Sequence, residues 1–197
     1  MFIKRLFDIL FAILGLLILA PVLLLTWIVV RVSSGGPVIF KQERSGLNGV
    51  PFTIYKFRTM YPEHGGSSVS VQGESRITPL GEVLRRFKID ELPELWNILK
   101  GDMSFVGPRP DMPEYTARLQ GDQREILTLR PGLTSPASIK YSREEQLLSS
   151  VSDPLKYFDE VIWPDKTEMN LEYLRDRTFS GDIRLIFRTL FGMGRKL

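Results

Sequence analysis

The hydrophobic pattern is dominated by one run of 22 residues, Ile9 to Val30, that carries no charged side chain. About 20 apolar residues in a helix are enough to cross the hydrocarbon core of a bilayer. Pro21 falls near the middle of the run, where it removes a backbone hydrogen bond and clashes with the carbonyl group four residues earlier. The run therefore predicts either one kinked spanning helix or two short helices that enter the membrane, bend at Ala20-Pro21 and leave on the same side.

Basic residues flank this run on both sides. Lys4 and Arg5 precede it, and Arg31, Lys41 and Arg44 follow it. Positive flanks favour the cytoplasmic face, and a re-entrant pair of helices would place both flanks there. A straight span would put one basic flank outside, but proline kinks are tolerated in spanning helices. The residue pattern alone leaves both topologies open.

Shorter periodicities follow the apolar run. Apolar and polar residues alternate on either side of Asn48-Gly49, which predicts a β-hairpin between Val38–Gln42 and Phe52–Phe57. Residues 61–75 are polar and rich in Gly and Ser, and loops of this length are often lids. The only histidine, His64, lies in this loop, and we expect it to be incidental.

Apolar residues at helical spacing predict a series of helices after the loop. The expected helical segments are 79–87, 91–101, 111–121, 122–129, 142–150, 154–177 with an interruption at Pro164, and 182–197. Residues 130–139 are expected to be extended and turn-rich. The last segment is basic and amphipathic, so it could lie on a membrane or pack on the domain. The predicted fold class is mainly α with a small β-hairpin.

The charge distribution adds to this picture. Residues 1–60 contain seven basic and two acidic side chains, a net of +5, so the remaining residues contribute −2 to the total of +3. Basic residues next to an apolar segment favour an anionic membrane surface or an anionic substrate over nucleic acid. There is no cysteine, which excludes disulfides and thiolate metal sites.

Two adjacent acids, Asp90 and Glu91, are the main candidates for chemistry. An N-cap aspartate accepts from the backbone N–H two or three residues on. Here Pro93 has no N–H, so only Leu92 could donate, and Asp90 is expected to be a poor cap. Glu91 suits the positive end of a helix dipole. The simplest alternative to a catalytic pair is a solvated acidic helix start.

Several cations could converge with these acids. Acids beside cations suit phosphoryl transfer, in which the cations, often with Mg²⁺, offset phosphate charge and a carboxylate holds the metal or attacks phosphorus. A helix N-terminus also favours phosphate. The candidate phosphate-binding residues are Lys56, Arg58, Arg85 and Arg109, with Arg86 and Lys88 nearby in the sequence.

Three segments, KFRTM (56–60), DELPELWNILKGDMSFVGPRP (90–110) and RPGLTSP (130–136), together with the proline-broken apolar run, resemble the monotopic phosphoglycosyl transferases, or bacterial sugar transferases. The resemblance covers nearly the whole chain and is most specific over 90–110. It implies a re-entrant membrane hairpin, residues 1–32, followed by a catalytic domain, residues 33–197, that is cytosolic and contains interfacial amphipathic helices.

The resemblance also implies the reaction. A sugar 1-phosphate would pass from a nucleotide diphosphate sugar, expected to be a UDP-sugar, to a polyprenyl phosphate, expected to be undecaprenyl phosphate. The intermediate would be a phosphoryl-aspartate, the cofactor Mg²⁺, and the products a polyprenyl diphosphate sugar and a nucleoside monophosphate. This would be the first membrane step of glycoconjugate and polysaccharide assembly.

Transferred to this sequence, the family's roles make Asp90 the nucleophile and Glu91 its partner, and both are expected to be metal ligands. Lys56, Arg58, Arg85 and Arg109 would contact phosphate or substrate. The expected location is the bacterial inner membrane, in contact with lipid, with both termini and the catalytic domain on the cytoplasmic face. A homodimer is left open.

The sequence departs from the family pattern at two places. The helix break is often Ser-Pro in the family and is Ala20-Pro21 here. Many members have a glycine after the threonine of the PG-x-T segment, where this chain has Ser135. A metal-dependent membrane phosphohydrolase and a non-enzymatic membrane adaptor are the alternatives to a transferase.

Overall fold

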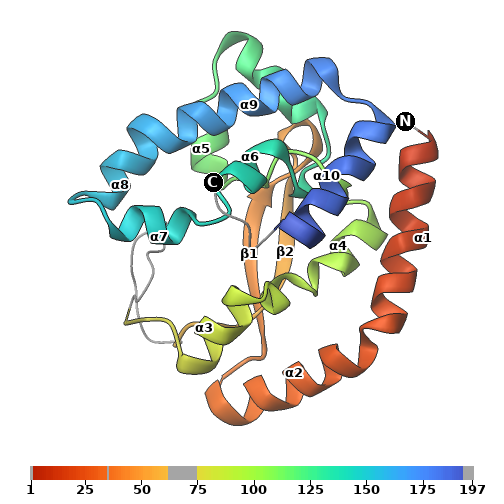
Figure 1. Ribbon diagram of the computed structural model, residues 1–197, viewed down its shortest axis with the longest axis vertical. Helices are drawn as coiled ribbons and strands as arrows, with labels where there is room; N and C mark the ends of the chain where they lie inside the picture. Colours follow the sequence, from red (N-terminus) through yellow and green to blue (C-terminus); the bar gives the residue numbers. More distant parts are fainter. Residues whose placement is uncertain (1, 35, 62–74, 193–197) are drawn as a thin grey trace. The chain divides into compact units, whose positions relative to one another are not determined.

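The computed structural model describes residues 2–34, 36–61 and 75–192, and these form two compact units. The first unit takes its described residues from the ranges 1–43, 53–66 and 73–101, and the second from 44–52, 67–72 and 102–197. Figure 1 traces the elements along the chain. Most of the predicted lid loop, including His64, lies outside the described residues, as does the end of the chain from residue 193.

The first unit begins with two helices, α1 (Phe2–Ile18) and α2 (Ala20–Ser34), which meet at a bend of 61° (Figure 1). Pro21 lies in the first turn of α2, where a missing N–H costs little. The predicted break of the helix at Ala20-Pro21 is therefore confirmed. No described helix is long and apolar enough to cross a bilayer alone, but the bent pair meets that test together by length and composition.

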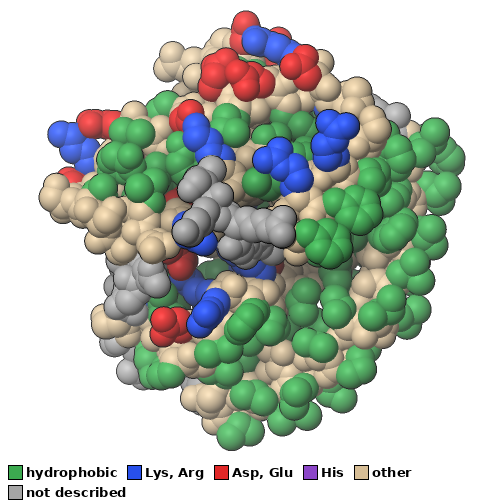
Figure 2. All heavy atoms as spheres, in the orientation of Figure 1, with side chains coloured by type: hydrophobic (Ala, Val, Ile, Leu, Met, Phe, Trp, Pro, Cys, Tyr) green, Lys and Arg blue, Asp and Glu red, His purple; other side chains and the backbone are tan. Residues whose placement is uncertain are grey.

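The outer faces of α1 and α2 are covered with exposed apolar side chains, which appear green along the right and lower edges of Figure 2. A contiguous exposed apolar surface of this kind marks a site of interaction with protein or membrane. The most exposed apolar side chains of the two helices, each more than half accessible, are Phe2, Ile3, Leu6, Leu10, Leu17, Ile18, Leu24, Leu25 and Val32.

The predicted hairpin is present as a two-stranded sheet of β1 (Ile39–Ser45) and β2 (Pro51–Phe57). The turn η1 (Leu47–Gly49) contains Asn48 at φ 57° and Gly49 at φ 75°, both in the left-handed region. Asn and Gly tolerate this region best, which is why the Asn-Gly pair signals a hairpin.

The base of the hairpin packs with α2 and with α3 (Pro79–Arg86). Thr78 caps α3 by accepting a hydrogen bond from the Gly81 N–H at 2.9 Å. Gly81 has no room for a side chain, because a β-carbon would lie 2.1 Å from the Thr59 carbonyl oxygen. The buried residues of this core are Val30, Val38, Phe57 and Leu84.

A 3₁₀ turn, η2 (Ile89–Glu91), leads into α4 (Glu94–Lys100), which ends at Gly101 with φ 98°. Helix α1 is tied to the C-terminal end of α4 by Arg5, which donates to the carbonyl oxygens of Ile98 at 2.7 Å and Leu99 at 2.9 Å. A cation at this end of a helix also complements the helix dipole.

The second unit contains the parallel pair β3 (Ser104–Val106) and β4 (Gly132–Thr134). The two strands approach so closely that a β-carbon on Gly132 would lie 2.1 Å from the Gly107 nitrogen. The helical elements are α5 (Pro113–Thr116), η3 (Gly121–Thr128), α6 (Pro136–Lys140), α7 (Glu144–Ser149), α8 (Pro154–Tyr157), η4 (Phe158–Ile162), α9 (Trp163–Asp176) and α10 (Phe179–Gly192).

Two sequence predictions are wrong in the second unit. Residues 130–139 are not extended throughout, because Ser135 caps the short helix α6 by accepting from the Ser138 N–H at 3.0 Å. Pro164 does not interrupt the helix of residues 154–176. The π-helical turn η4 precedes it, so Pro164 falls in the first turn of α9, where proline is tolerated.

Helix α10 is amphipathic, as predicted. Leu185 and Ile186 pack against a core cluster formed by Val106, Leu129 and Tyr173. On its exposed part, Phe187 and Phe191 stack with ring centroids 6.0 Å apart, and Leu190 is 66% exposed. Packing on the domain therefore accounts for only one part of the apolar surface of this helix.

We predict that Arg5→Ala lowers the free energy of unfolding by about 1.5–3 kcal/mol, the range for hydrogen bonds that involve a charged group. Arg5→Lys should be intermediate, because one ammonium group is less suited than a guanidinium to bonding two carbonyl groups. The measurement is thermal unfolding in detergent followed by circular dichroism. Arg31→Ala, at an exposed position on α2, should change stability by less than about 0.5 kcal/mol. Equal stability of Arg5→Ala and the parent would contradict the tie between α1 and α4.

Candidate active site

Asp90 and Glu91 lie in η2, immediately before α4. They are only 7% and 8% exposed, unlike the solvated helix start that was the simplest alternative. Lys88, just before the turn, adopts a left-handed conformation with φ 56°. Pro93 then starts the first turn of α4. The local sequence therefore turns sharply into the helix and buries both acids.

The sequence context predicted that Asp90 would be a poor N-cap, and in the structure Asp90 does not cap a helix. Neither η2 nor α4 has a side-chain N-cap hydrogen bond. The Oδ1 atom of Asp90 is buried and has no hydrogen-bond partner among the described residues. Burial raises the pKa of Asp90 above its ordinary value of 3.8, and the charge of Glu91 raises it further. The cations Lys56, Lys88 and Arg85 oppose this pKa rise.

Lys56 forms ion pairs with two carboxylates of the candidate site. Its Nζ atom lies 2.8 Å from Oε1 of Glu91 and 3.1 Å from Oε1 of Glu94. Glu94 is 1% exposed and was not among the residues predicted from the sequence. Its spacing of three from Glu91 was an available signal, because residues three apart share a helix face.

Arg85 and Arg58 are the other predicted phosphate-binding residues that lie in the first unit. The Nε atom of Arg85 donates to the Thr59 hydroxyl at 3.0 Å, and its charge acts on the Asp90 carboxyl. Nη1 of Arg58 is buried and has no hydrogen-bond partner among the described residues. A donor left in this state is costly unless a ligand supplies the acceptor.

Strand alternation separates two kinds of side chain on β2. Lys56 belongs to one side of the strand, and Tyr55 and Phe57 belong to the other. Arg58 is the first residue after the strand. Asn97, which is fully buried, fixes α4 to this strand. It accepts from the Tyr55 N–H at 3.1 Å and donates to the Thr53 carbonyl oxygen at 2.7 Å. Asn97 was also missed in the sequence, where it resembles an ordinary helix residue.

Arg109 lies in the second unit, three residues after the end of β3, between the buried residues Pro108 and Pro110. The structure thus brings Lys56, Arg85 and the two acids together in the first unit. The role expected for Arg109 stays a prediction.

The donor set suits a Mg²⁺ ion that also binds substrate. Mg²⁺ prefers oxygen ligands and is commonly held by one or two carboxylates together with substrate phosphates. Oδ1 of Asp90 is a buried acceptor with no partner among the described residues, and Glu91 is its neighbour. Within the described ranges, no group of three or more acidic, His or Cys side chains could hold a metal. A Mg²⁺ ion here would need oxygen ligands from the substrate.

Comparison with known proteins adds the family context. The family described as "Bacterial sugar transferase" matches residues 1–196. The chain is 37% identical over 190 residues, 96% of this chain and 86% of the relative, to the uncharacterized sugar transferase EpsL of Bacillus subtilis. It is 35% identical over 200 residues, 95% of this chain and 68% of the relative, to the UDP-glucose:undecaprenyl-phosphate glucose-1-phosphate transferase of Caulobacter vibrioides.

The name of a further relative specifies a different sugar. Over 122 residues, 61% of this chain and 68% of the relative, the chain is 43% identical to a putative undecaprenyl-phosphate N-acetylgalactosaminyl 1-phosphate transferase of Bacillus subtilis.

We predict that Asp90→Asn stabilises the fold at neutral pH. Because the Asp90 pKa is raised in the folded state, the folded chain binds the proton more tightly than the unfolded chain does. The stability that comes from this proton is complete below pH 3.8 and is lost as pH rises through the raised pKa. The stability gained by Asp90→Asn should therefore be small in acid and grow toward neutral pH. Denaturant unfolding in metal-free buffer with EDTA measures this difference.

Asp182→Asn is the matched control. This aspartate is also buried, but it accepts a hydrogen bond from the Tyr173 hydroxyl at 2.6 Å. Its substitution should destabilise the fold, because a charge-assisted hydrogen bond is weakened. A loss of stability on Asp90→Asn at neutral pH would show that the Asp90 charge has a partner that offsets its burial.

Proposed function

The chain belongs to the bacterial sugar transferase family, and we propose that it transfers a sugar 1-phosphate from a UDP-sugar to undecaprenyl phosphate. The observation that carries the proposal is the buried Asp90 carboxyl, whose Oδ1 has no partner among the described residues, beside the Lys56–Glu91–Glu94 cluster. A carboxylate with an available oxygen among cations is suited to attack a phosphorus atom.

In the first step of the proposed reaction, a carboxylate oxygen of Asp90 attacks the β-phosphorus of the nucleotide sugar. A bond forms between this oxygen and phosphorus, and the bond from phosphorus to the oxygen bridging the two phosphates breaks. Uridine monophosphate leaves with that oxygen. Asp90 then carries the sugar phosphate as an acyl phosphate.

In the second step, a phosphate oxygen of the polyprenyl phosphate attacks the same phosphorus atom. The bond from phosphorus to Asp90 breaks, which restores the carboxylate and gives polyprenyl diphosphate sugar. The attacking group is the carboxylate form of Asp90. Burial raises the pKa of Asp90, and the charges of Lys56, Lys88 and Arg85 oppose this rise and so favour the carboxylate.

The cations have the phosphates as their proposed partners. Arg58 offers a buried Nη1 that lacks an acceptor among the described residues, and Arg85 is held by Thr59. Lys56, positioned by Glu91 and Glu94, would hold a phosphate oxygen beside the acids. Arg109 is assigned to substrate by its place in the family motif.

Asp90 and Glu91 would hold Mg²⁺ together with phosphate oxygens of the substrate. When bound, the ion supplies neutralisation of the charge that develops on the phosphoryl oxygens and the leaving group. The residues of the chain hold the phosphates and supply the attacking carboxylate.

The proposed location is the cytoplasmic membrane of a bacterium, with the bent pair α1–α2 entering and leaving one leaflet. The exposed apolar faces of α1 and α2 would then contact lipid. The exposed aromatic residues of α10, Phe187 and Phe191, would lie at the interface, with Arg184 and Arg188 near the headgroups. A polyprenyl chain is costly to remove from the bilayer, so an interfacial catalytic domain meets both substrates.

We predict that Asp90→Asn lowers transfer by at least about 1,000-fold, because the amide is not a nucleophile toward phosphorus. The assay uses a UDP-sugar labelled in the sugar and counts label in an organic-extractable lipid. Asp176→Asn, at an exposed position near the end of α9, should retain the parent rate. A near-parent rate for Asp90→Asn would contradict the nucleophile. Label released only into water would favour a phosphohydrolase, and a panel of UDP-sugars in the same assay identifies the sugar.

We also predict that both ends of the chain lie on the cytoplasmic side. The native chain has no cysteine, so a cysteine added at each terminus gives a unique label site. Both should react with a membrane-impermeant maleimide in inverted vesicles, and neither in intact spheroplasts. Reaction of one terminus in spheroplasts would establish a straight span in place of the one-leaflet pair.

A further inference from the structure

Helix α10 is joined to strand β4 by a pair of hydroxyl groups. Oγ1 of Thr189 lies 2.6 Å from Oγ1 of Thr134. The Thr189 hydroxyl also donates to the Leu185 carbonyl oxygen at 2.9 Å. Because a hydroxyl has only one proton to donate, Thr134 must be the donor of the bond between the two threonines. Thr134 is 5% exposed, so Thr189 is the acceptor that satisfies a buried donor of β4.

Strand β4 in turn holds the segment that carries Arg109. The Gly107 N–H donates to the Thr134 carbonyl oxygen at 3.0 Å, and the Gly132 N–H donates to the Pro108 carbonyl oxygen at 2.8 Å. These two bonds fix the backbone that leads into Arg109, and the proline ring of Pro108 restricts it further. The position of Arg109 therefore follows the position of β4.

The threonine pair gives α10 a directional contact that apolar packing does not supply. Leu185 and Ile186 pack against the core of the second unit, but such contacts are non-directional. A hydrogen bond requires a defined distance and angle, so it fixes how a helix is rotated and shifted along its axis. The Tyr173–Asp182 bond provides such a contact between α9 and the start of α10. The threonine pair provides it between β4 and the other half of the helix.

We propose that Thr189 is a positioning residue for Arg109, which it holds at the substrate through Thr134 and β4. This rests on the proposed function, in which Arg109 contacts the substrate. The exposed apolar side chains of α10 are proposed to lie at the membrane interface. The same link therefore sets the height of Arg109 above the membrane, where the two substrates meet.

A purely structural role is the alternative for the threonine pair. In that case the loss of the hydrogen bond would lower the stability of the second unit, and any change in activity would not depend on Arg109. The experiment therefore measures stability and activity separately, and repeats the substitution in a chain that lacks the Arg109 side chain.

Thr189→Val and Thr178→Val are matched substitutions at the two ends of one helix. Thr178 accepts from the Gly181 N–H at 3.1 Å at the start of α10, whereas Thr189 lies near its end. Thr189→Val should lower kcat/KM for the UDP-sugar by about 10-fold, because small displacements of a positioning group have large effects on rate. Thr189→Ser, which keeps the hydroxyl, and Thr178→Val should both stay within about 2-fold of the parent. Rates are measured in nanodiscs, per folded enzyme, below the unfolding temperature of every variant.

Thr134→Val breaks the same link from the side of β4. Thr189 keeps its bond to Leu185 in this variant, so no buried donor of the pair is left without an acceptor. The variant should therefore remain folded and show the same loss of about 10-fold in kcat/KM. It replaces Thr189→Val in every comparison if that variant does not fold.

The double substitution with Arg109→Ala separates the two roles. Arg109→Ala should itself lower kcat/KM, and adding Thr189→Val should then lower it by no more than about 2-fold, because Thr189 acts through Arg109. A second full loss of about 10-fold would show a structural role and overturn the proposal.

Two further outcomes distinguish this inference from the proposed function. Arg109→Ala with the parent rate, or no release of uridine monophosphate by the parent, would count against the proposed function and, with it, the inference. A large loss for Arg109→Ala together with parent rates for Thr189→Val and Thr134→Val would overturn only the positioning role of Thr189.

Discussion

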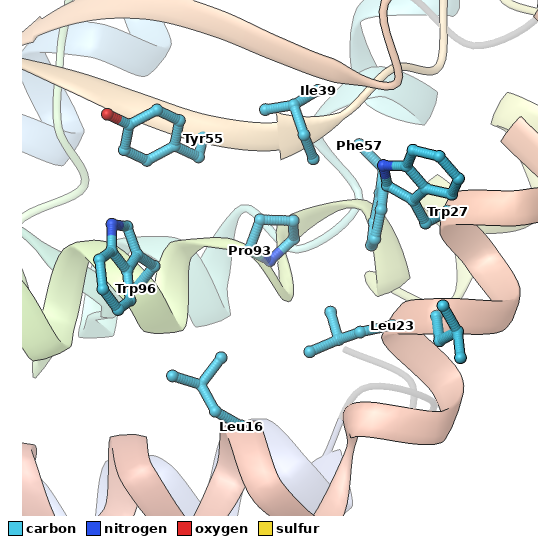
Figure 3. A pocket seen from close by; sticks show the side chains of 9 residues that line it. Leu16, Leu23, Trp27, Ile39, Tyr55, Phe57, Pro93 and Trp96 are labelled. Carbon is cyan, nitrogen blue, oxygen red and sulfur yellow. The ribbon is translucent and has the colours of Figure 1, made fainter. Parts of the chain in front are cut away.

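The contact between the Lys56 ammonium and the buried carboxylates of Glu91 and Glu94 fixes the geometry of the first unit. Buried carboxylates are costly unless a counter-charge lies close by, so the strand that carries Lys56 must lie against η2 and α4. Asn97 secures the same pair of segments through the backbone of β2. The apolar groove lined by residues of β2 and α4 (Figure 3), the position of Asp90 and the core beneath the hairpin all depend on this one docking of a strand on a helix.

The sequence predicted the features that depend on local backbone chemistry. Pro21 predicted the bend, Asn48-Gly49 the hairpin, and Pro93 the failure of Asp90 as a cap. Features that depend on contacts between residues distant in the sequence could not be predicted in this way. The pairing of β3 with β4 depends on the close approach of Gly107 and Gly132, which are far apart in the chain.

The candidate site shows the same limit. Asp90, Glu91 and Lys56 were found because they lie in the segments that carry the family resemblance, and Arg85 because it lies close to the two acids in the sequence. The first unit brings all four together. Glu94 was missed because a glutamate in a short helix usually faces solvent, and only the position of Lys56 reveals its burial. Whether a charge is buried depends on tertiary contacts that no periodicity records.

The left-handed backbone of Lys88 has a further consequence. A side chain with a β-carbon in this region costs about 1–2 kcal/mol, and only glycine adopts the region freely. Lys88 nevertheless brings a positive charge whose field lowers the pKa of Asp90. Glycine at this position would relieve the backbone and remove that field. Backbone strain and the electrostatic support of the Asp90 carboxylate therefore favour different residues at position 88.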